Sequence, residues 1–71
     1  MLVDILTQKR NGEWRVAFTV ECDDVATKVS VDDDIGVCIY VECVDENGKC
    51  VYRAPMRFAD RWIIQYEVRR A

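Results

Sequence analysis

The sequence predicts an all-β fold, with five or six antiparallel strands in a meander that forms a small barrel or sandwich. Two observations carry this expectation. Apolar and polar side chains alternate along most of the chain, and two Asn-Gly pairs mark tight turns between alternating segments. No helix start signal is followed by a sustained apolar period of 3.6 residues. With 71 residues, 51% of them apolar, the chain is expected to fold as one domain, residues 1–71.

The first hairpin is predicted at Asn11-Gly12, because a type I′ turn needs positive φ at both central residues and this pair tolerates it. A two-residue turn sets Thr7 opposite Val16 and, further along, Ile5 opposite Phe18. One face of the hairpin is then largely apolar, as expected for a sheet with one buried side. That face consists of Val3, Ile5, Thr7, Trp14, Val16, Phe18 and Val20.

Two further strands are predicted in the middle of the chain. After a turn at Asp23-Asp24, residues 25–31 alternate valine or threonine with smaller or polar side chains. Residues 32–36 then form an acidic loop that ends in glycine. The next strand, residues 37–44, has apolar side chains on both faces, which is typical of a strand in the centre of a sheet.

The second Asn-Gly pair, Asn47-Gly48, predicts the turn that leads into a fifth strand. A two-residue turn is favoured because it sets Glu42 opposite Arg53 on the outer face, where opposite charges stabilise the pairing. The same register sets Ile39 opposite Met56. A four-residue loop is the alternative.

The end of the chain also reads as a strand. Pro55 cannot donate a hydrogen bond to a neighbouring strand, so it predicts an edge position or a bulge. Residues 61–70 alternate, with two adjacent isoleucines, a tyrosine and a valine that favour a strand; a helix from Asp60 is the alternative. One open sheet is not stable alone, so we expect a barrel, a sandwich, or completion by dimerisation.

No catalytic apparatus is recognisable, so we expect a non-enzymatic protein with no cofactor and no metal. The chain has no histidine, which removes the commonest general base and metal ligand. Its glycines are isolated, and no phosphate-binding motif occurs. Cys38 and Cys43 are an odd number of residues apart, so their thiols point to opposite faces of a strand and do not share a metal ion.

Cysteine usage and hydropathy suggest an intracellular setting. No apolar run is long enough to span a membrane, and no signal peptide is recognisable. The four cysteines lie in apolar runs and are expected to pack as free thiols, with disulfides as the alternative. We therefore expect a cytoplasmic location. The composition also looks like that of short phage or mobile-element reading frames, which would mean the host cytoplasm or a virion; no motif assigns a family.

Charge is unevenly distributed along the chain. Residues 1–48 carry 11 acidic and 4 basic side chains, whereas residues 49–71 carry 2 acidic and 6 basic ones. This division predicts two oppositely charged patches. Basic and aromatic side chains in the C-terminal third also suit a single-stranded nucleic-acid-binding β-barrel. The net charge of −3 opposes binding to a polyanion, however, and the pleat turns Trp62 and Tyr66 inward, so nucleic acid is the less favoured partner.

These observations favour a protein-interaction module that binds a protein partner or its own copies, such as a small phage-type inhibitor or assembly component. A nucleic-acid-binding barrel and a purely structural homo-oligomer are the alternatives. No membrane partner is expected. The candidate partner-binding residues are Asp32, Asp33 and Asp34 in the acidic loop and Arg57, Arg69 and Arg70 in the basic third.

Overall fold

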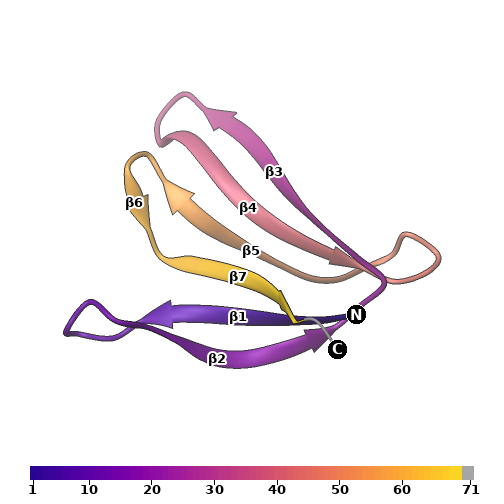
Figure 1. Ribbon diagram of the computed structural model, residues 1–71. Coiled ribbons are helices and arrows are strands. Elements are labelled where there is room, and N and C mark those ends of the chain that lie inside the picture. Colours follow the sequence, from indigo (N-terminus) through magenta and orange to yellow (C-terminus); the bar gives the residue numbers. More distant parts are fainter. Residues whose placement is uncertain (70–71) are drawn as a thin grey trace.

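A computed structural model describes residues 1–69 of the chain, which form seven strands and no helix (Figure 1). They make two antiparallel sheets with strand orders β2-β1-β7, here sheet A, and β3-β4-β5-β6, here sheet B. The all-β prediction is therefore confirmed, whereas the strand number was underestimated. The strands are β1 (Leu2–Gln8), β2 (Trp14–Glu21), β3 (Asp24–Asp32), β4 (Gly36–Val44), β5 (Cys50–Phe58), β6 (Arg61–Trp62) and β7 (Ile64–Arg69).

The chain passes from one sheet to the other at two points. Cys22 and Asp23 connect β2 to β3, and Ile63 separates β6 from β7. The Ile63 N–H donates to the Met56 carbonyl of β5 at 2.8 Å, after which β7 leaves sheet B and pairs with β1. The C-terminal segment is thus a strand rather than a helix, but the change of sheet divides it in two.

The predicted meander is correct for the pairing of β3, β4 and β5, but the predicted pairing of β2 with β3 is wrong. A turn at Asp23-Asp24 would pair β2 with β3, whereas β2 pairs with β1, and β1 pairs on its other side with β7. After Cys22, which is buried in the core, the Asp23 N–H donates to the Val44 carbonyl of β4 at 2.8 Å, so the chain joins sheet B instead of turning back along β2. Among the described strands, β2 and β7 are the end strands of sheet A and β3 and β6 those of sheet B, so the barrel is not closed.

A β-bulge at Ala17 changes the face of half of β2. From Leu2 to Ile5 of β1, the pairing with β2 is as predicted. After Ile5 the register shifts, and Leu6, rather than Thr7, lies opposite Val16. Side chains of directly opposed residues share a face of the sheet. Val16 and Trp14 therefore lie on the outer face of sheet A, and the predicted apolar face is wrong at these two positions.

The β4–β5 pairing agrees with the prediction near its middle. Glu42 lies opposite Arg53, as expected from their charges. Met56 is an extra residue in β5, so Ile39 lies opposite Arg57 instead of Met56. This bulge directly follows the proline, in agreement with the expectation that the proline marks an edge or a bulge.

Both Asn-Gly pairs lie in three-residue loops rather than the predicted two-residue turns. In the first hairpin, the Gly12 N–H donates to the Lys9 carbonyl at 3.0 Å, and the Lys9 N–H donates to the Glu13 carbonyl at 2.7 Å. Gly48 closes the second loop in the same way. A type I turn followed by one left-handed residue has this geometry, and Gly12 and Gly48 have φ values of +92° and +79°.

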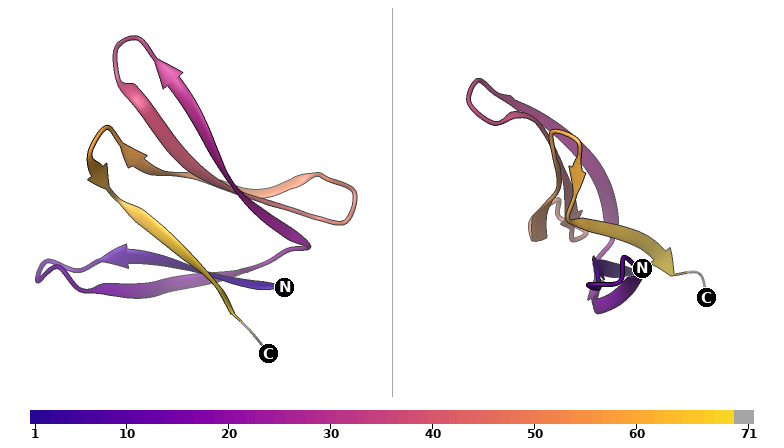
Figure 2. Two further views of the ribbon diagram at one scale, coloured as in Figure 1. Left: turned by 45° about the horizontal axis from the view of Figure 1, so that its top comes forward. Right: turned by 90° about the vertical axis from the view of Figure 1, so that its left-hand side faces the viewer.

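A small core lies between the two sheets, which pack together there and diverge away from it (Figure 2). The chain exposes 5212 Å², whereas a compact monomer of 8.3 kDa exposes about 4,600 Å². Its radius of gyration is 12.9 Å, against about 11 Å for a compact domain of this length. The molecule is more open than its size requires. The buried apolar residues are Val3, Ile5, Cys22, Val41, Cys43, Ala54 and Met56.

The four cysteines are free thiols in different environments. Cys22 and Cys43 are buried in the core as small apolar side chains, as predicted. Cys38 is half-buried, and Cys50 is exposed at the start of β5, so the expectation of a packed side chain is wrong there. Burial, together with the neighbouring Cys22, raises the pKa of the Cys43 thiol to about 11.

We predict that a thiol reagent distinguishes these environments in the folded protein. Cys50 reacts first and Cys38 more slowly, because the thiolate of an exposed cysteine is the accessible nucleophile. Cys22 and Cys43 react only after unfolding. The measurement is time-resolved labelling followed by peptide mass spectrometry, with a denatured sample as the control that labels all four sites. Equal labelling rates at the four cysteines in the native protein would contradict this core.

Candidate interaction surface

The outer half of the β3–β4 hairpin, residues 28–40, lies away from sheet A and is called the arm (Figures 1 and 2). The reason is that the two sheets diverge toward the tip of this hairpin, although β2 of sheet A, with eight residues, is almost as long as β3 and β4, with nine each. Contact with sheet A reaches Thr27, whose Oγ1 lies 3.1 Å from the Tyr66 hydroxyl of β7.

The core face of sheet B continues along the arm without a cover. Thr27 lies opposite the fully buried Val41, and alternation places Val29 and Val31 on the same face. Val31 lies opposite Val37. The exposed fractions are 63% for Val29, 76% for Val31 and 47% for Val37. These three residues, called the valine row, form an apolar strip that nothing in the described chain covers.

Toward β5 and β6 the same face carries a cation. Arg57 lies opposite Ile39 on one side and opposite Trp62 on the other. Its guanidinium carbon is 5.4 Å from the centre of the Trp62 ring, a cation–π geometry. Its Nε is buried and finds no hydrogen-bond acceptor within residues 1–69. The apolar strip therefore ends at an arginine that still has an unused donor.

The three predicted acidic residues form the tip of the arm. One Asp32 oxygen accepts hydrogen bonds from the Asp34 N–H at 2.8 Å and the Ile35 N–H at 3.1 Å. This is an Asx turn, so the Asp32 carboxylate shapes the loop. The side chains of Asp33 and Asp34 are exposed and are not held in this way. They place negative charge directly beyond the valine row.

The predicted basic residues lie in different places. Arg57 is at the same end of sheet B as the acidic loop, because the Ala59 N–H beside the β5–β6 turn donates to the Val37 carbonyl at 3.1 Å. Arg69 lies on sheet A, and Arg70 lies outside the described residues. The acidic and basic candidates of residues 1–69 are therefore not separated onto two opposed patches.

Arg69 is engaged within the fold. Its Nη2 lies 2.6 Å from one oxygen of Asp4 and its Nε 3.3 Å from the other, while the Thr19 hydroxyl donates to Asp4 at 2.7 Å. Asp4 is 9% exposed, and the three residues connect β7, β1 and β2. Alternation alone puts Asp4 opposite Thr19, but Arg69 can be added only when the β1–β7 pairing is known. The pKa of Asp4 is lowered by the hydrogen bond from Thr19 and by the hydrogen bonding and positive charge of Arg69.

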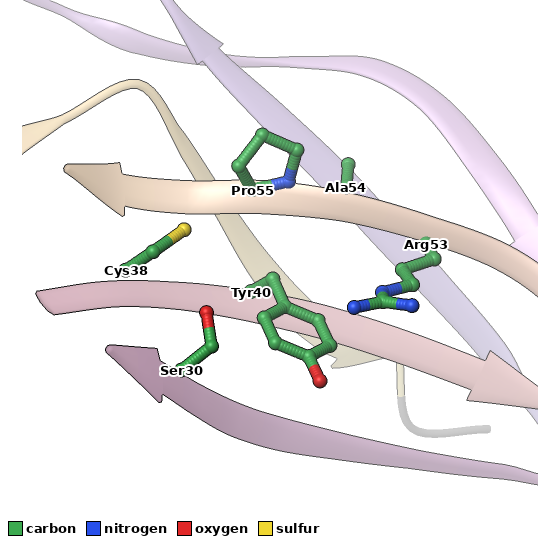
Figure 3. Close-up of a pocket in the computed structure, with 6 residues that line it drawn as sticks. All are labelled: Ser30, Cys38, Tyr40, Arg53, Ala54 and Pro55. Carbon is green, nitrogen blue, oxygen red and sulfur yellow. The ribbon is translucent and has the colours of Figure 1, made fainter. Parts of the chain in front are cut away.

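The opposite face of sheet B has a shallow hollow of about 290 Å³, which the sequence did not indicate (Figure 3). Its clearest feature is the guanidinium of Arg53, which lies 4.1 Å from the centre of the Tyr40 ring. Ligand sites are usually larger and enclose most of the ligand. The hollow is open and offers a serine and a thiol with no histidine to activate either. Its residues are Ser30, Cys38, Tyr40, Arg53, Ala54 and Pro55.

Other kinds of site have no counterpart in the described part of the chain. No group of three or more Cys, Asp or Glu side chains in residues 1–69 is placed to hold a metal ion. None of these residues forms a helix long and apolar enough to cross a membrane. In comparisons with known proteins, the chain matches no family model, no curated protein and no solved structure. The interpretation of the arm therefore depends on its geometry.

We predict a pH dependence of stability that is due to Asp4. Its pKa in the folded state is below the unfolded value of about 4, so its stabilising contribution is fully present above that pH. The contribution is lost as the pH falls through the folded-state pKa. Urea unfolding of the wild type and of Asp4→Asn at neutral and acidic pH measures this effect. The difference between the two proteins should shrink in acid, and a constant difference would contradict the role of Asp4.

Proposed function

We propose that the chain is a non-enzymatic protein-interaction module and that the valine row of the arm is its contact surface. The single observation that carries this proposal is the core-type face of sheet B that continues where sheet A no longer covers it. Val29 and Val31 share this face with the fully buried Val41 and Cys43 of β4, yet they are 63% and 76% exposed. A contiguous apolar strip of this kind marks interaction surfaces in soluble proteins.

The surroundings of the strip resemble the anatomy of protein interfaces. Such interfaces have an apolar centre, a polar rim, and anchors that are often Trp or Arg. Here Asp33 and Asp34 lie beyond the strip at the tip of the arm, and Arg57, which stacks on Trp62, lies beside the strip on β5. Burying the valines against a partner would contribute about 25 cal/mol for each Å² of apolar surface removed from water.

The same geometry limits the chemistry of the partner. The partner surface must be apolar where it meets the valine row, so that no polar group is buried there without a hydrogen-bond partner. It must also avoid negative charge next to the acidic tip. A protein surface with an apolar centre and no carboxylate facing Asp33 and Asp34 fulfils these conditions.

We predict that Val37→Asp abolishes partner binding while Val51→Asp does not. The two valines are matched controls: Val37 is 47% exposed in the valine row, and Val51 is 48% exposed in β5 at the other end of sheet B. Because both are surface positions, the cost in stability should be similar and about 1 kcal/mol or less. The measurement is quantitative affinity capture from the cells that make the protein, with circular dichroism to confirm folding.

The expected result is one or more specific proteins that are captured by the wild type and by Val51→Asp but not by Val37→Asp. If Val37→Asp captures the same proteins in the same amounts as the wild type, the valine row is not the contact surface and the proposal fails.

A further inference from the structure

The free edge of β3 is unusually well suited to pairing with another strand. β3 pairs with β4 over nine residues with no register shift, and it contains no proline. In the ribbon views no strand lies along its other side (Figures 1 and 2). The free edge of β2, in contrast, is interrupted by the bulge at Ala17. Bulges and prolines are two of the features that protect an edge strand, and β3 has neither; its charged side chains include Lys28 and Asp32, which the pairing proposed below brings together.

Two hydrogen bonds determine which groups of β3 face this edge. The carbonyl of Val37 accepts from Ala59 and the N–H of Asp45 donates to Lys49, so odd-numbered residues of β4 direct their peptide groups toward β5. In an antiparallel pair the direction alternates with each residue. Since Val31 lies opposite Val37, the N–H and carbonyl groups of Val29 and Val31 point away from β4. Those of the even-numbered residues point toward β4.

We propose that β3 pairs antiparallel with β3 of a second copy of this chain, with Ser30 opposite Ser30 at the two-fold axis. This inference goes beyond the proposed function, because the second copy pairs with the edge of β3, whereas the proposed contact surface is the face formed by the valine row. Only registers in which odd-numbered residues face odd-numbered ones allow both edges to form hydrogen bonds. Among these, the register centred on Ser30 sets Lys28 of each copy opposite Asp32 of the other, and Val29 opposite Val31.

Registers centred on the neighbouring residues form no Lys–Asp pair within β3. Centring the pairing on Val29 would set Lys28 opposite Ser30. Centring it on Lys28 would set two lysines opposite each other, and like charges directly opposed are destabilising. Centring it on Val31 would set Val29 opposite the exposed Asp33. The Ser30 register instead forms two Lys–Asp pairs on the outer face and two valine pairs on the inner face. The two copies of sheet B become one continuous sheet in which the valine rows lie side by side.

Cross-linking tests this register directly. The peptide groups of Val29 and Val31 face the free edge, so those of Ser30 do not. Ser30 and Ser30 of the second copy therefore form a non-hydrogen-bonded pair, in which the two Cα atoms come within about 4.5 Å of each other. That separation suits a disulfide. Cys38 lies opposite Ser30 on β4, so it must be removed to prevent an internal bridge, and the exposed Cys50 is removed with it.

The test protein is therefore Ser30→Cys in a Cys38→Ala, Cys50→Ser background, oxidised with diamide. The matched control is Lys28→Cys in the same background, which faces Asp32 rather than itself. The expected result is a disulfide-linked dimer of Ser30→Cys, identified by mass spectrometry, that forms at least tenfold faster than that of Lys28→Cys. Equal or slower cross-linking of Ser30→Cys would overturn the register.

A charge exchange tests the same contact without cysteines. Lys28→Asp sets two carboxylates opposite each other at both ends of the pairing, and Asp32→Lys sets two lysines there. Each protein alone should dimerise about tenfold or more weakly than the wild type by light scattering, because two favourable pairs become repulsive. An equimolar mixture restores both pairs and should form a heterodimer. A mixture no tighter than its components would overturn the proposal.

These outcomes are independent of the test of the proposed function. Lys28 lies on the outer face of β3, whereas Val37 lies on the inner face of β4 and is not at the edge. If partner capture depends on Val37 but the cross-linking and charge exchange fail, the module binds a different protein and only the self-pairing falls. If Val37→Asp leaves capture unchanged as well, both proposals fall.

Discussion

The structure depends on the divergence of its two sheets. Sheet A covers sheet B only where the two lie close together, as they do at the contact between Thr27 and Tyr66. The same alternating row contains the fully buried Val41 and Cys43 on one side of this contact and the exposed Val37 on the other. Core and candidate interface are therefore two parts of one apolar face.

Sheet A is held in place by β1 and by the two points where the chain changes sheets. β1 has a partner on each side, and Asp4 binds Thr19 and Arg69 from those two partners across its outer face. Cys22 and Ile63 connect this sheet to the other at opposite ends. The arm lies outside this framework, and stability in proteins is lowest where buried contacts are few. We therefore expect the arm to be the part that a partner orders most.

The alternation of side chains was enough to predict the strands and the face of most residues in β3 and β4. It failed where one residue is added to a strand, at Ala17, Val51 and Met56, because a bulge changes the register without any change in composition. It also failed after Cys22, where the chain crosses to the other sheet instead of forming the expected hairpin. Bulges and crossings depend on packing between distant segments. For the same reason the valines of the arm were expected to be buried, and their exposure became visible only with the arrangement of the two sheets.

The central claim is that β3 has a free edge, formed by Val29 and Val31, that a second copy covers. Residue-resolved amide hydrogen exchange of the wild type and of Lys28→Asp, both at high protein concentration, tests it most directly. The account predicts protection at Val29, Ser30 and Val31 in the wild type, and an alternating pattern in Lys28→Asp, with Ser30 still protected by β4 and the two valines exchanging fast. Fast exchange of Val29 and Val31 in the wild type would contradict the account.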